Sequence, residues 1–172
     1  MINLKKHIDT HPNFPKKGIL FYDISSLMAN AKIWKETINQ FSNLVKKYKP
    51  QVLAGIESRG FIFASAIGYK LGCDVIMIRK KGKLPGETIS YNYKLEYGKD
   101  CLEIQKRKEL KNKRIILIDD LLATGGTANA AIKLLIKTKT NIIAFLCLIE
   151  LTNLKGRNNI EIETNSLLSF DE

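Results

Sequence analysis

The sequence predicts a single doubly wound α/β domain: a central, mostly parallel sheet with helices on both faces and a β-hairpin lid. Apolar, β-branched runs at residues 115–118 and 142–149 suit strands that are buried on both faces of a parallel sheet. Segments with helical spacing alternate with such runs, which is typical of this fold class. The 172 residues contain neither an internal repeat nor a linker, so we expect residues 1–172 to form one domain.

The first half of the chain predicts an arm, an amphipathic helix and one strand–turn–helix unit. The expected elements are a weakly helical arm at residues 1–13 that ends at Pro12, an apolar loop or short strand at 19–21, a helix at 31–48, a strand at 51–56 and a helix at 61–71. The turn of the unit, residues 57–60, contains Arg59, which can hold phosphate oxygens through two parallel hydrogen bonds. A surface arginine without a ligand is an equally open reading of Arg59.

The second half predicts further alternation of strands and helices, interrupted by a polar hairpin. The expected elements are a strand at residues 74–78, a hairpin of 88–97 with 102–105 around Gly98, a strand at 115–118, a helix at 128–136, a strand at 142–149, a loop with basic residues at 152–157 and a final short strand at 160–164. The hairpin has little to bury, so we expect it to act as a lid, at about residues 82–105, rather than as a core element.

Composition places the chain among ordinary globular proteins, because 45% of its residues are hydrophobic and 26% are charged. Its formal net charge of +11 raises the question of a polyanionic partner such as nucleic acid. No five or six basic residues follow one another, which favours lysines scattered over solvated faces. We therefore expect no nucleic-acid partner, although part of this charge can attract phosphorylated substrates.

The cysteines and the apolar runs bear on the compartment. Cys73, Cys101 and Cys147 are odd in number and widely spaced, which argues against a disulfide framework or a zinc site and for a reducing compartment. The N-terminus lacks an apolar signal core, and the longest apolar run, residues 142–149, is too short to span a bilayer. We expect a cytoplasmic protein that does not bind membranes.

The only two histidines, His7 and His11, do not predict a catalytic or metal site. They are four residues apart and could share a helix face, but no Cys, Asp or Glu is spaced to complete a metal site with them. A histidine-dependent nucleophilic triad would have to be built from the extreme N-terminus. We therefore expect chemistry that does not depend on histidine.

Residues 114–127, RIILIDDLLATGGT, carry the strongest functional signal. The apolar run ends at Asp119 and Asp120, where an α/β sheet usually binds its ligand. The small residues that follow let backbone N–H groups approach a phosphate at a helix N-terminus. Carboxylates for hydroxyls beside such a loop indicate a sugar phosphate. No GxxxxGK[ST] and no GxGxxG after a strand occurs, which argues against a P-loop or a dinucleotide enzyme.

Two further stretches are consistent with this ligand but weak alone. Residues 79–83, RKKGK, put four cations around Gly82, and solvent, nucleic acid or a polyphosphate could all be their partner. Residues 14–28 offer an apolar platform around Phe21, which suits a flat ring or simply covers a core edge. We call residues 79–83 the basic loop.

Residues 116–127 resemble the signature of the type I phosphoribosyltransferases, which use phosphoribosyl pyrophosphate. Other segments resemble, in the same order, the branch of that family that acts on adenine: FPKKGILFYDIS, GIESRGFIF, IRKKGKLPGETISYNYKLEYGK, LEIQK and LIELTNLKGR. Together they cover residues 13–157. The resemblance implies the type I phosphoribosyltransferase fold and a purine-salvage reaction with Mg²⁺, in which the 5-phosphoribosyl group passes to N9 of adenine and gives AMP and pyrophosphate.

The resemblance also assigns roles to the residues that hold phosphoribosyl pyrophosphate. Asp119 and Asp120 accept hydrogen bonds from the ribose 2- and 3-hydroxyls and stabilise the positive charge that grows on the ring as the C1–pyrophosphate bond breaks. The 5-phosphate is held by what we call the phosphate loop: Ala123, Thr124, Gly125, Gly126 and Thr127.

Pyrophosphate binding is implied for Ser58 and Arg59, with a strained, cis peptide expected before Arg59. Three cations of the basic loop, Arg79, Lys80 and Lys83, are expected to reach the neighbouring subunit's pyrophosphate, which implies a homodimer. Mg²⁺ is expected to be held mainly by pyrophosphate, ribose hydroxyls and water, without a metal site made by the protein itself.

Adenine is expected to lie between Phe21 and Leu121, with main-chain groups of Leu20 and Tyr22 reading its 6-amino edge. Glu96 matches the lid acid that handles the imidazole proton as N9 attacks, while the closed lid excludes water. The chain departs from the family pattern where Tyr22 replaces a common Arg and Lys81 replaces an occasional one. The first departure removes a phosphate contact and leaves the main-chain adenine contact.

Two alternatives compete with this assignment. A 6-oxopurine phosphoribosyltransferase recruits a Lys side chain late in the chain, and only Lys155 could serve. A regulator with the same fold that binds nucleic acid would share the positive charge, but the chain has no added helical DNA-binding domain.

Overall fold

A computed structural model of the protein describes residues 2–95 and 98–171. Its described residues fall into two compact units, Met1–Phe41 and Ser42–Glu172. Glu96, the expected lid acid, lies outside the described residues.

The first unit contains a short helix, a two-stranded sheet and a helical turn. A 3₁₀ helix η1 (Leu4–His7) is capped by the Asn3 side chain, and strand β1 (Asp9–Pro12) pairs antiparallel with β2 (Leu20–Asp23) before α1 (Ser25–Met28). The expected helical arm is therefore wrong beyond His7. All four β1 side chains are exposed, so no apolar alternation marks the strand, and its pairing with β2 forms it.

Helix α2 (Ala31–Lys46) leads from the first unit into the second. It starts where the Asn30 side chain accepts hydrogen bonds from the N–H groups of Lys32 and Ile33, which satisfies two donors at the helix end. Its buried apolar side chains recur at helical spacing: Ile33, Ile38, Phe41 and Val45. The expected helix at residues 31–48 is confirmed to within two residues.

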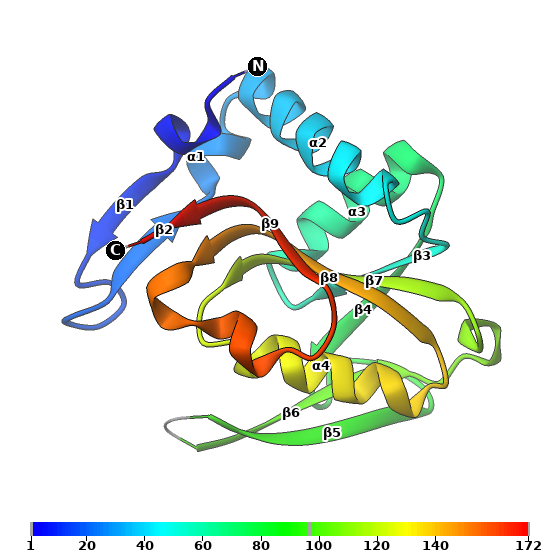
Figure 1. Ribbon diagram of the computed structural model, residues 1–172. Coiled ribbons are helices and arrows are strands. Elements are labelled where there is room, and N and C mark those ends of the chain that lie inside the picture. Colours follow the sequence, from blue (N-terminus) through cyan, green and yellow to red (C-terminus); the bar gives the residue numbers. More distant parts are fainter. Residues whose placement is uncertain (1, 96–97, 172) are drawn as a thin grey trace. The chain divides into compact units, whose positions relative to one another are not determined.

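The second unit is built on a seven-stranded sheet of order β5-β6-β4-β3-β7-β8-β9 (Figure 1). Its strands are β3 (Val52–Ile56), β4 (Asp74–Lys80), β5 (Thr88–Leu95), β6 (Gly98–Gln105), β7 (Arg114–Leu122), β8 (Asn141–Leu151) and β9 (Thr164–Phe170). The pairs from β4 to β9 are parallel, and the β5–β6 hairpin joins β4 antiparallel. The predicted α/β class with a mostly parallel sheet is confirmed.

Helices α3 (Gly60–Leu71) and α4 (Gly126–Lys137) lie on opposite faces of this sheet (Figure 1). The cause is topological. The connections β3–α3–β4 and β7–α4–β8 move in opposite directions along the sheet, and right-handed crossovers then place their helices on opposite faces. The strand order therefore reverses between β3 and β7. Ligands bind at the carboxyl ends of strands at such a point.

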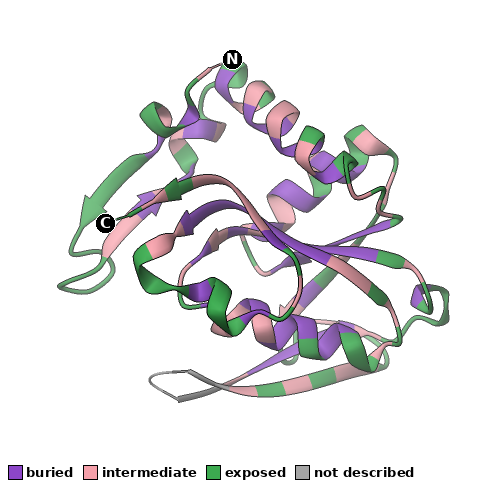
Figure 2. Cartoon of the chain, in the orientation of Figure 1, coloured by how far each residue is buried: buried purple, intermediate pink, exposed green. Residues whose placement is uncertain are grey.

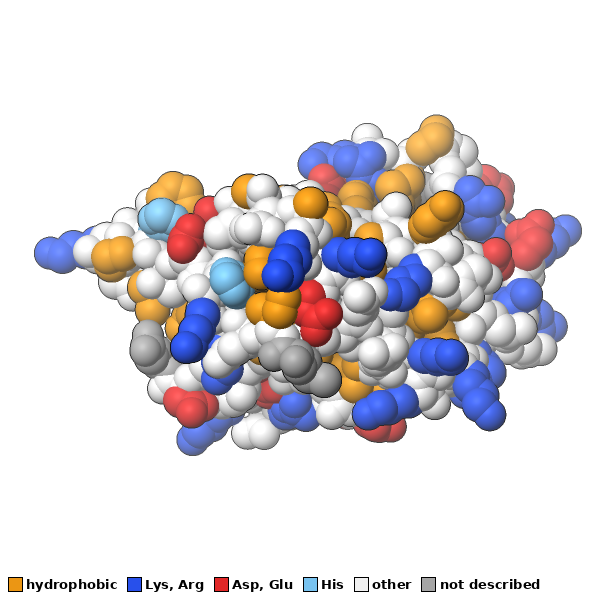
Figure 3. Space-filling view, turned by 90° about the horizontal axis from the view of Figure 1, so that it is seen from above, with side chains coloured by type: hydrophobic (Ala, Val, Ile, Leu, Met, Phe, Trp, Pro, Cys, Tyr) orange, Lys and Arg blue, Asp and Glu red, His pale blue; other side chains and the backbone are white. Residues whose placement is uncertain are grey.

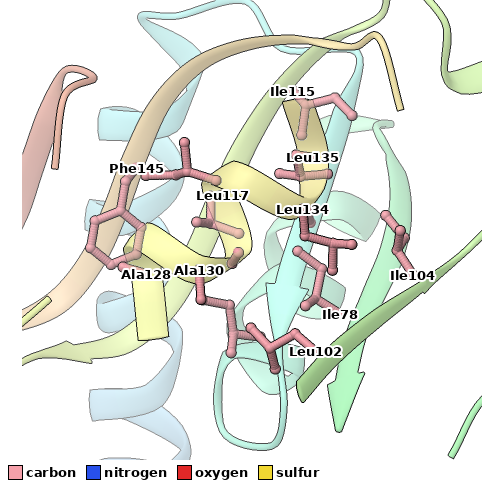
Figure 4. Packing of buried hydrophobic residues seen from close by; sticks show 14 of the residues in the cluster. Ile78, Leu102, Ile104, Ile115, Leu117, Ala128, Ala130, Leu134, Leu135 and Phe145 are labelled. Carbon is pink, nitrogen blue, oxygen red and sulfur yellow. The ribbon is translucent and has the colours of Figure 1, made fainter. Parts of the chain in front are cut away.

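The core of the second unit lies between α4 and the sheet (Figure 4). Leu134 and Leu135 of α4 are fully buried against Leu117 of β7 and Phe145 of β8 in one apolar cluster. Figure 2 shows β7 and β8 as buried over most of their length, whereas β5 alternates between exposed and half-buried positions. Continuous apolar runs therefore mark central strands, and alternation marks the edge.

Two expectations about the second unit are wrong. The hairpin does contribute to the core, because Leu102 and Ile104 are 1% exposed within the apolar cluster. The last strand is Thr164–Phe170 rather than residues 160–164, since it forms by parallel pairing with β8 and its sequence, TNSLLSF, carries only a weak apolar pattern. Three short 3₁₀ helices connect the larger elements: Lys108–Leu110, Thr152–Leu154 and Gly156–Asn159.

Over the residues that are described, no helix has the length and apolar character needed to cross a bilayer. Lys and Arg side chains are spread over the face shown in Figure 3, with uncharged surface between them.

The α4 interface offers a stability test with a control on the same helix. Leu134→Ala should lower the free energy of unfolding by about 3 kcal/mol, because it removes a fully buried side chain and leaves a cavity. Ile136→Ala, at a position that is 60% exposed, should change it by less than about 0.5 kcal/mol. Urea unfolding of both variants measures the difference, and equal losses would contradict the packing described for α4.

Candidate active site

A pocket of about 370 Å³ opens at the carboxyl ends of β3 and β7, where the strand order reverses. It is lined by Glu57, Ser58, Arg59 and residues 119–128. The structure thus brings together, within the second unit, most of the residues that the sequence singles out: both acids, Ser58, Arg59, Leu121 and the whole phosphate loop. Asp119 and Asp120 lie inside β7, which runs to Leu122, and not just beyond a strand that ends at residue 118.

The two acids lie side by side in the chain, with Asp120 buried at 6% exposure and Asp119 half-buried. The N–H of Asp120 donates to Oδ1 of Asp119 at 2.9 Å, and Nη2 of Arg59 lies 2.8 Å from Oδ2 of Asp120. Burial raises the pKa of Asp119 well above its usual range, and the charge of Asp120 adds to this rise. Burial also raises the pKa of Asp120, but the Arg59 guanidinium opposes it. Asp120 therefore holds negative charge more readily than Asp119.

The phosphate loop packs against the loop after β8 through bare backbone. A Cβ on Gly156 would lie 2.1 Å from the carbonyl oxygen of Ala123, and one on Gly125 would lie 2.4 Å from that of Gly156. Gly125, at φ 82°, caps α4, whose first-turn N–H groups have no acceptor within the helix. Asn159 Nδ2 donates to the carbonyl of Thr124 at 2.8 Å. The loop is thereby fixed with donors available to an anion.

Several of these supporting residues were missed at the level of sequence. Gly60 admits α3 next to β7, because a Cβ there would lie 2.7 Å from the carbonyl oxygen of Ile118. Arg157 forms two hydrogen bonds with the carboxylate of Glu150, which is 4% exposed, and these bonds lower the pKa of Glu150. The glycines of GIESRG and LKGR were visible signals, but their contacts join segments far apart in the chain.

The basic loop is held by acids of the same chain. Nη2 of Arg79 lies 3.4 Å from Oε1 of Glu57, Nζ of Lys83 lies 2.5 Å from the same atom, and the N–H of Lys80 donates to Oε2 at 2.9 Å. Burial alone would raise the pKa of Glu57, but the hydrogen bonds from Lys83, Lys80 and Arg79 outweigh it and lower the pKa to about 2. Nζ of Lys80 pairs with Asp100 at 3.1 Å.

The cis peptide expected before Arg59 lies one bond earlier, between Glu57 and Ser58. Within residues 2–95 and 98–171, no group of three or more His, Cys, Asp or Glu side chains is arranged to hold a metal ion. The cysteines described, Cys73, Cys101 and Cys147, are free thiols.

The residues expected to bind adenine come from both units. In the first, Phe21 lies on β2 with its ring edge-to-face against Phe14 at 5.1 Å, and Tyr22 is buried while Leu20 is half-buried. In the second, Leu121 lines the pocket. Adenine binding by these residues stays a prediction.

Paired carboxylates can bind sugar hydroxyls, and a backbone anion site beside them can bind a phosphate. The pocket is therefore suited to a phosphorylated sugar. Comparison with known proteins agrees. The phosphoribosyl transferase domain family matches residues 23–167. An adenine phosphoribosyltransferase of Rhodospirillum rubrum is 49% identical over 170 residues, 99% of each chain.

Solved structures give the same result. The adenine phosphoribosyltransferase of Thermoanaerobacter pseudethanolicus superimposes with a TM-score of 0.92 at 40% identity, covering 97% of this chain and 98% of that one. That of Saccharomyces cerevisiae, in complex with an imino-altritol bisphosphate and adenine, also gives 0.92, at 36% identity over 96% of each chain. The chain belongs to the phosphoribosyltransferase family, and within it to the adenine phosphoribosyltransferases.

The Glu57 cluster predicts a pH dependence of stability. The pKa of Glu57 is lower in the folded chain than its ordinary value of 4.5, so its contribution is complete above about pH 4.5 and is lost as the pH falls toward 2. The wild-type chain should therefore exceed Glu57→Gln in free energy of unfolding most at pH 6, and by progressively less at pH 4 and pH 3.

Urea unfolding at the three pH values measures this difference. Glu161→Gln is the matched control, because Glu161 is exposed and takes part in none of the salt bridges found among the described residues. A gap between wild type and Glu57→Gln that stays constant from pH 6 to pH 3 would contradict the depressed pKa.

Proposed function

We propose that the chain transfers the 5-phosphoribosyl group of phosphoribosyl pyrophosphate to N9 of adenine, giving AMP and pyrophosphate in purine salvage. The observation that carries this proposal is the pocket at the strand reversal, which is lined both by the acid pair and by the loop that offers backbone N–H groups to an anion. Membership of the adenine phosphoribosyltransferases supports adenine as the base over the 6-oxopurines.

The sugar phosphate is proposed to bind with its 5-phosphate at residues 123–127 and its 2- and 3-hydroxyls on Asp119 and Asp120. The first-turn N–H groups of α4 and the helix dipole favour an anion at that end. The hydroxyls supply hydrogen-bond donors to these two carboxylates. These hydrogen bonds offset the cost of removing the acids from water when the sugar binds.

Catalysis follows from the charge that develops on the sugar. As the bond from C1 to pyrophosphate breaks, the ribose ring gains positive charge, and fixed carboxylates beside it stabilise the transition state more than the ground state. Arg59 opposes the rise in the pKa of Asp120, which favours its charged form, and with Ser58 is proposed to hold the departing pyrophosphate. N9 of adenine then attacks C1, and Glu96 is proposed to handle the imidazole proton.

Mg²⁺ is proposed as the cofactor, with oxygen ligands from pyrophosphate, ribose hydroxyls and water. The donor set suits this arrangement, because Asp119 and Asp120 are the only carboxylates among the residues that line the pocket apart from Glu57, which is engaged by cations. A bound Mg²⁺ ion would neutralise charge on the leaving group.

A homodimer is proposed from an exposed apolar patch next to the basic loop. Tyr69 of α3 is 94% exposed, and Val75 and Met77 of β4 are 42% and 45% exposed. Since β4 runs on into Arg79 and Lys80, a second copy that covers this patch would lie near the basic loop. The pyrophosphate bound by that second copy would then compete with Glu57 for Arg79 and Lys83.

A reducing, cytoplasmic location is proposed in keeping with the three free cysteines.

The base assignment is tested by turnover with adenine, hypoxanthine and guanine at saturating Mg²⁺ and phosphoribosyl pyrophosphate. Adenine should be used at least about tenfold better, because a mismatched polar edge leaves groups of the site unpaired. Equal rates with the three bases would contradict the adenine assignment. If no pyrophosphate were released with any of them, the proposal that the chain is a phosphoribosyltransferase enzyme would be contradicted.

A further inference from the structure

Asn159 contacts the phosphate loop from outside the pocket. Its side-chain Nδ2 donates a hydrogen bond to the carbonyl oxygen of Thr124 at 2.8 Å, and its Cβ lies 3.4 Å from the position that a Cβ on Gly125 would occupy. Of the described residues, Thr124 and Gly125 line the pocket and Asn159 does not. Any effect of Asn159 on a bound phosphate must therefore pass through the backbone of the phosphate loop.

The hydrogen bond from Asn159 sets the direction of a backbone donor. The carbonyl of Thr124 and the N–H of Gly125 belong to one planar peptide, which is trans, so the two groups point in opposite directions. Gly125 adopts φ 82°, and a glycine takes up positive and negative φ about equally readily, so this peptide can turn over at low cost. Because Asn159 holds the carbonyl, the N–H of Gly125 is held pointing away from Asn159.

The N–H of Gly125 is available to a ligand. Within the described residues it donates to no other group, and Gly125 lines the pocket at the N-terminus of α4. Backbone N–H groups at this end of a helix favour an anion. An inverted peptide would instead turn the carbonyl oxygen of Thr124 toward the pocket, where it would repel an anion. The orientation of this one peptide thus decides between attraction and repulsion of a phosphate.

The helical turn that carries Asn159 is fixed to the end of the sheet. Asn159 ends the 3₁₀ helix Gly156–Asn159, and Arg157 of the same turn forms two hydrogen bonds with Glu150 of β8, Nε to Oε1 at 2.5 Å and Nη2 to Oε2 at 2.6 Å. Nη1 of Arg157 also donates to the carbonyl of Thr164 on β9. Because the turn is held at two strands, little conformational freedom is lost when the Asn159 amide forms its hydrogen bond.

We propose that Asn159 is a positioning residue for the 5-phosphate of phosphoribosyl pyrophosphate, which acts by holding the peptide between Thr124 and Gly125 with its N–H toward the pocket. The pair of Glu150 and Arg157 keeps Asn159 in place. The inference rests on the proposed assignment of residues 123–127 to the 5-phosphate.

The test compares Asn159→Ala with Asn158→Ala. Asn158 is the matched control, because it is exposed in the same turn and its side chain makes no hydrogen bond within the described residues. In Asn159→Ala, KM for phosphoribosyl pyrophosphate should rise about five- to tenfold, the effect of one lost hydrogen bond, while kcat and KM for adenine stay within about twofold. Asn158→Ala should behave as wild type.

Inhibition constants separate positioning of the 5-phosphate from a general weakening of the site. Asn159→Ala should weaken inhibition by ribose 5-phosphate by the same factor as it raises KM, and leave inhibition by pyrophosphate within about twofold of wild type. In Asn159→Asp the carboxylate cannot donate to the Thr124 carbonyl but can accept the N–H of Gly125, so binding of ribose 5-phosphate should fall further than in Asn159→Ala. Asn158→Asp adds the same charge one residue away and controls for simple repulsion.

An unchanged KM for phosphoribosyl pyrophosphate in Asn159→Ala, an equal rise in Asn158→Ala, equal weakening of inhibition by ribose 5-phosphate and pyrophosphate, or equal losses in Asn159→Asp and Asn158→Asp would overturn the proposal. Failure of the proposed function gives a different result, since the wild-type chain would then form no AMP from adenine, whereas its binding of ribose 5-phosphate can still be measured by calorimetry.

Discussion

The pocket depends on one topological constraint: two neighbouring parallel strands, β3 and β7, send their chains to opposite faces of the sheet. Right-handed crossovers require this once the connections leave in opposite directions. The turn after β3 and the loop after β7 then lead away from each other, and side chains from both line the crevice between them. Ser58 and Arg59 arrive from one strand and the acid pair and phosphate loop from the other. Every functional assignment in the second unit starts from this placement.

Electrostatics at the crevice are arranged as matched pairs rather than as free charge. Arg59 faces Asp120, and Glu57 holds Arg79 and Lys83, so that cations and anions stay close without a ligand. A sugar pyrophosphate offers both hydroxyl donors and phosphate charge, and can replace each of these internal partners. The site is therefore preorganised with groups whose interactions the substrate can take over, which limits the cost of desolvating them on binding.

The sequence pattern predicts those elements whose formation depends on residues that are close together in the chain. The buried runs of β7 and β8, the amphipathic helix α2 and the glycine-rich start of α4 were all visible, because each depends on residues close in the chain. The pairing of β1 with β2 and of β9 with β8 was not, since exposed or mixed strands form through partners distant in sequence. The sequence of the hairpin does not show what it buries, because the side chains that cover it come from α4.

The same distinction applies to the site. Asp119, Asp120 and the phosphate loop stand in one segment, so spacing alone indicated a sugar phosphate. Gly156 and Asn159 support that loop from more than thirty residues away. The glycine of LKGR is visible in the sequence, but its contact with the phosphate loop is not. The sequence gives Glu57 no role for a related reason, since the cations that it binds lie on β4 and in the basic loop, and only the fold brings them to it.

A crystal structure of the chain with Mg²⁺ and phosphoribosyl pyrophosphate tests most directly where the sugar phosphate lies. We expect the 5-phosphate within hydrogen-bond distance of the N–H groups of residues 125–127, and the ribose hydroxyls on Asp119 and Asp120. A ligand bound with its ribose away from the acid pair, or with its 5-phosphate outside the phosphate loop, would contradict this expectation.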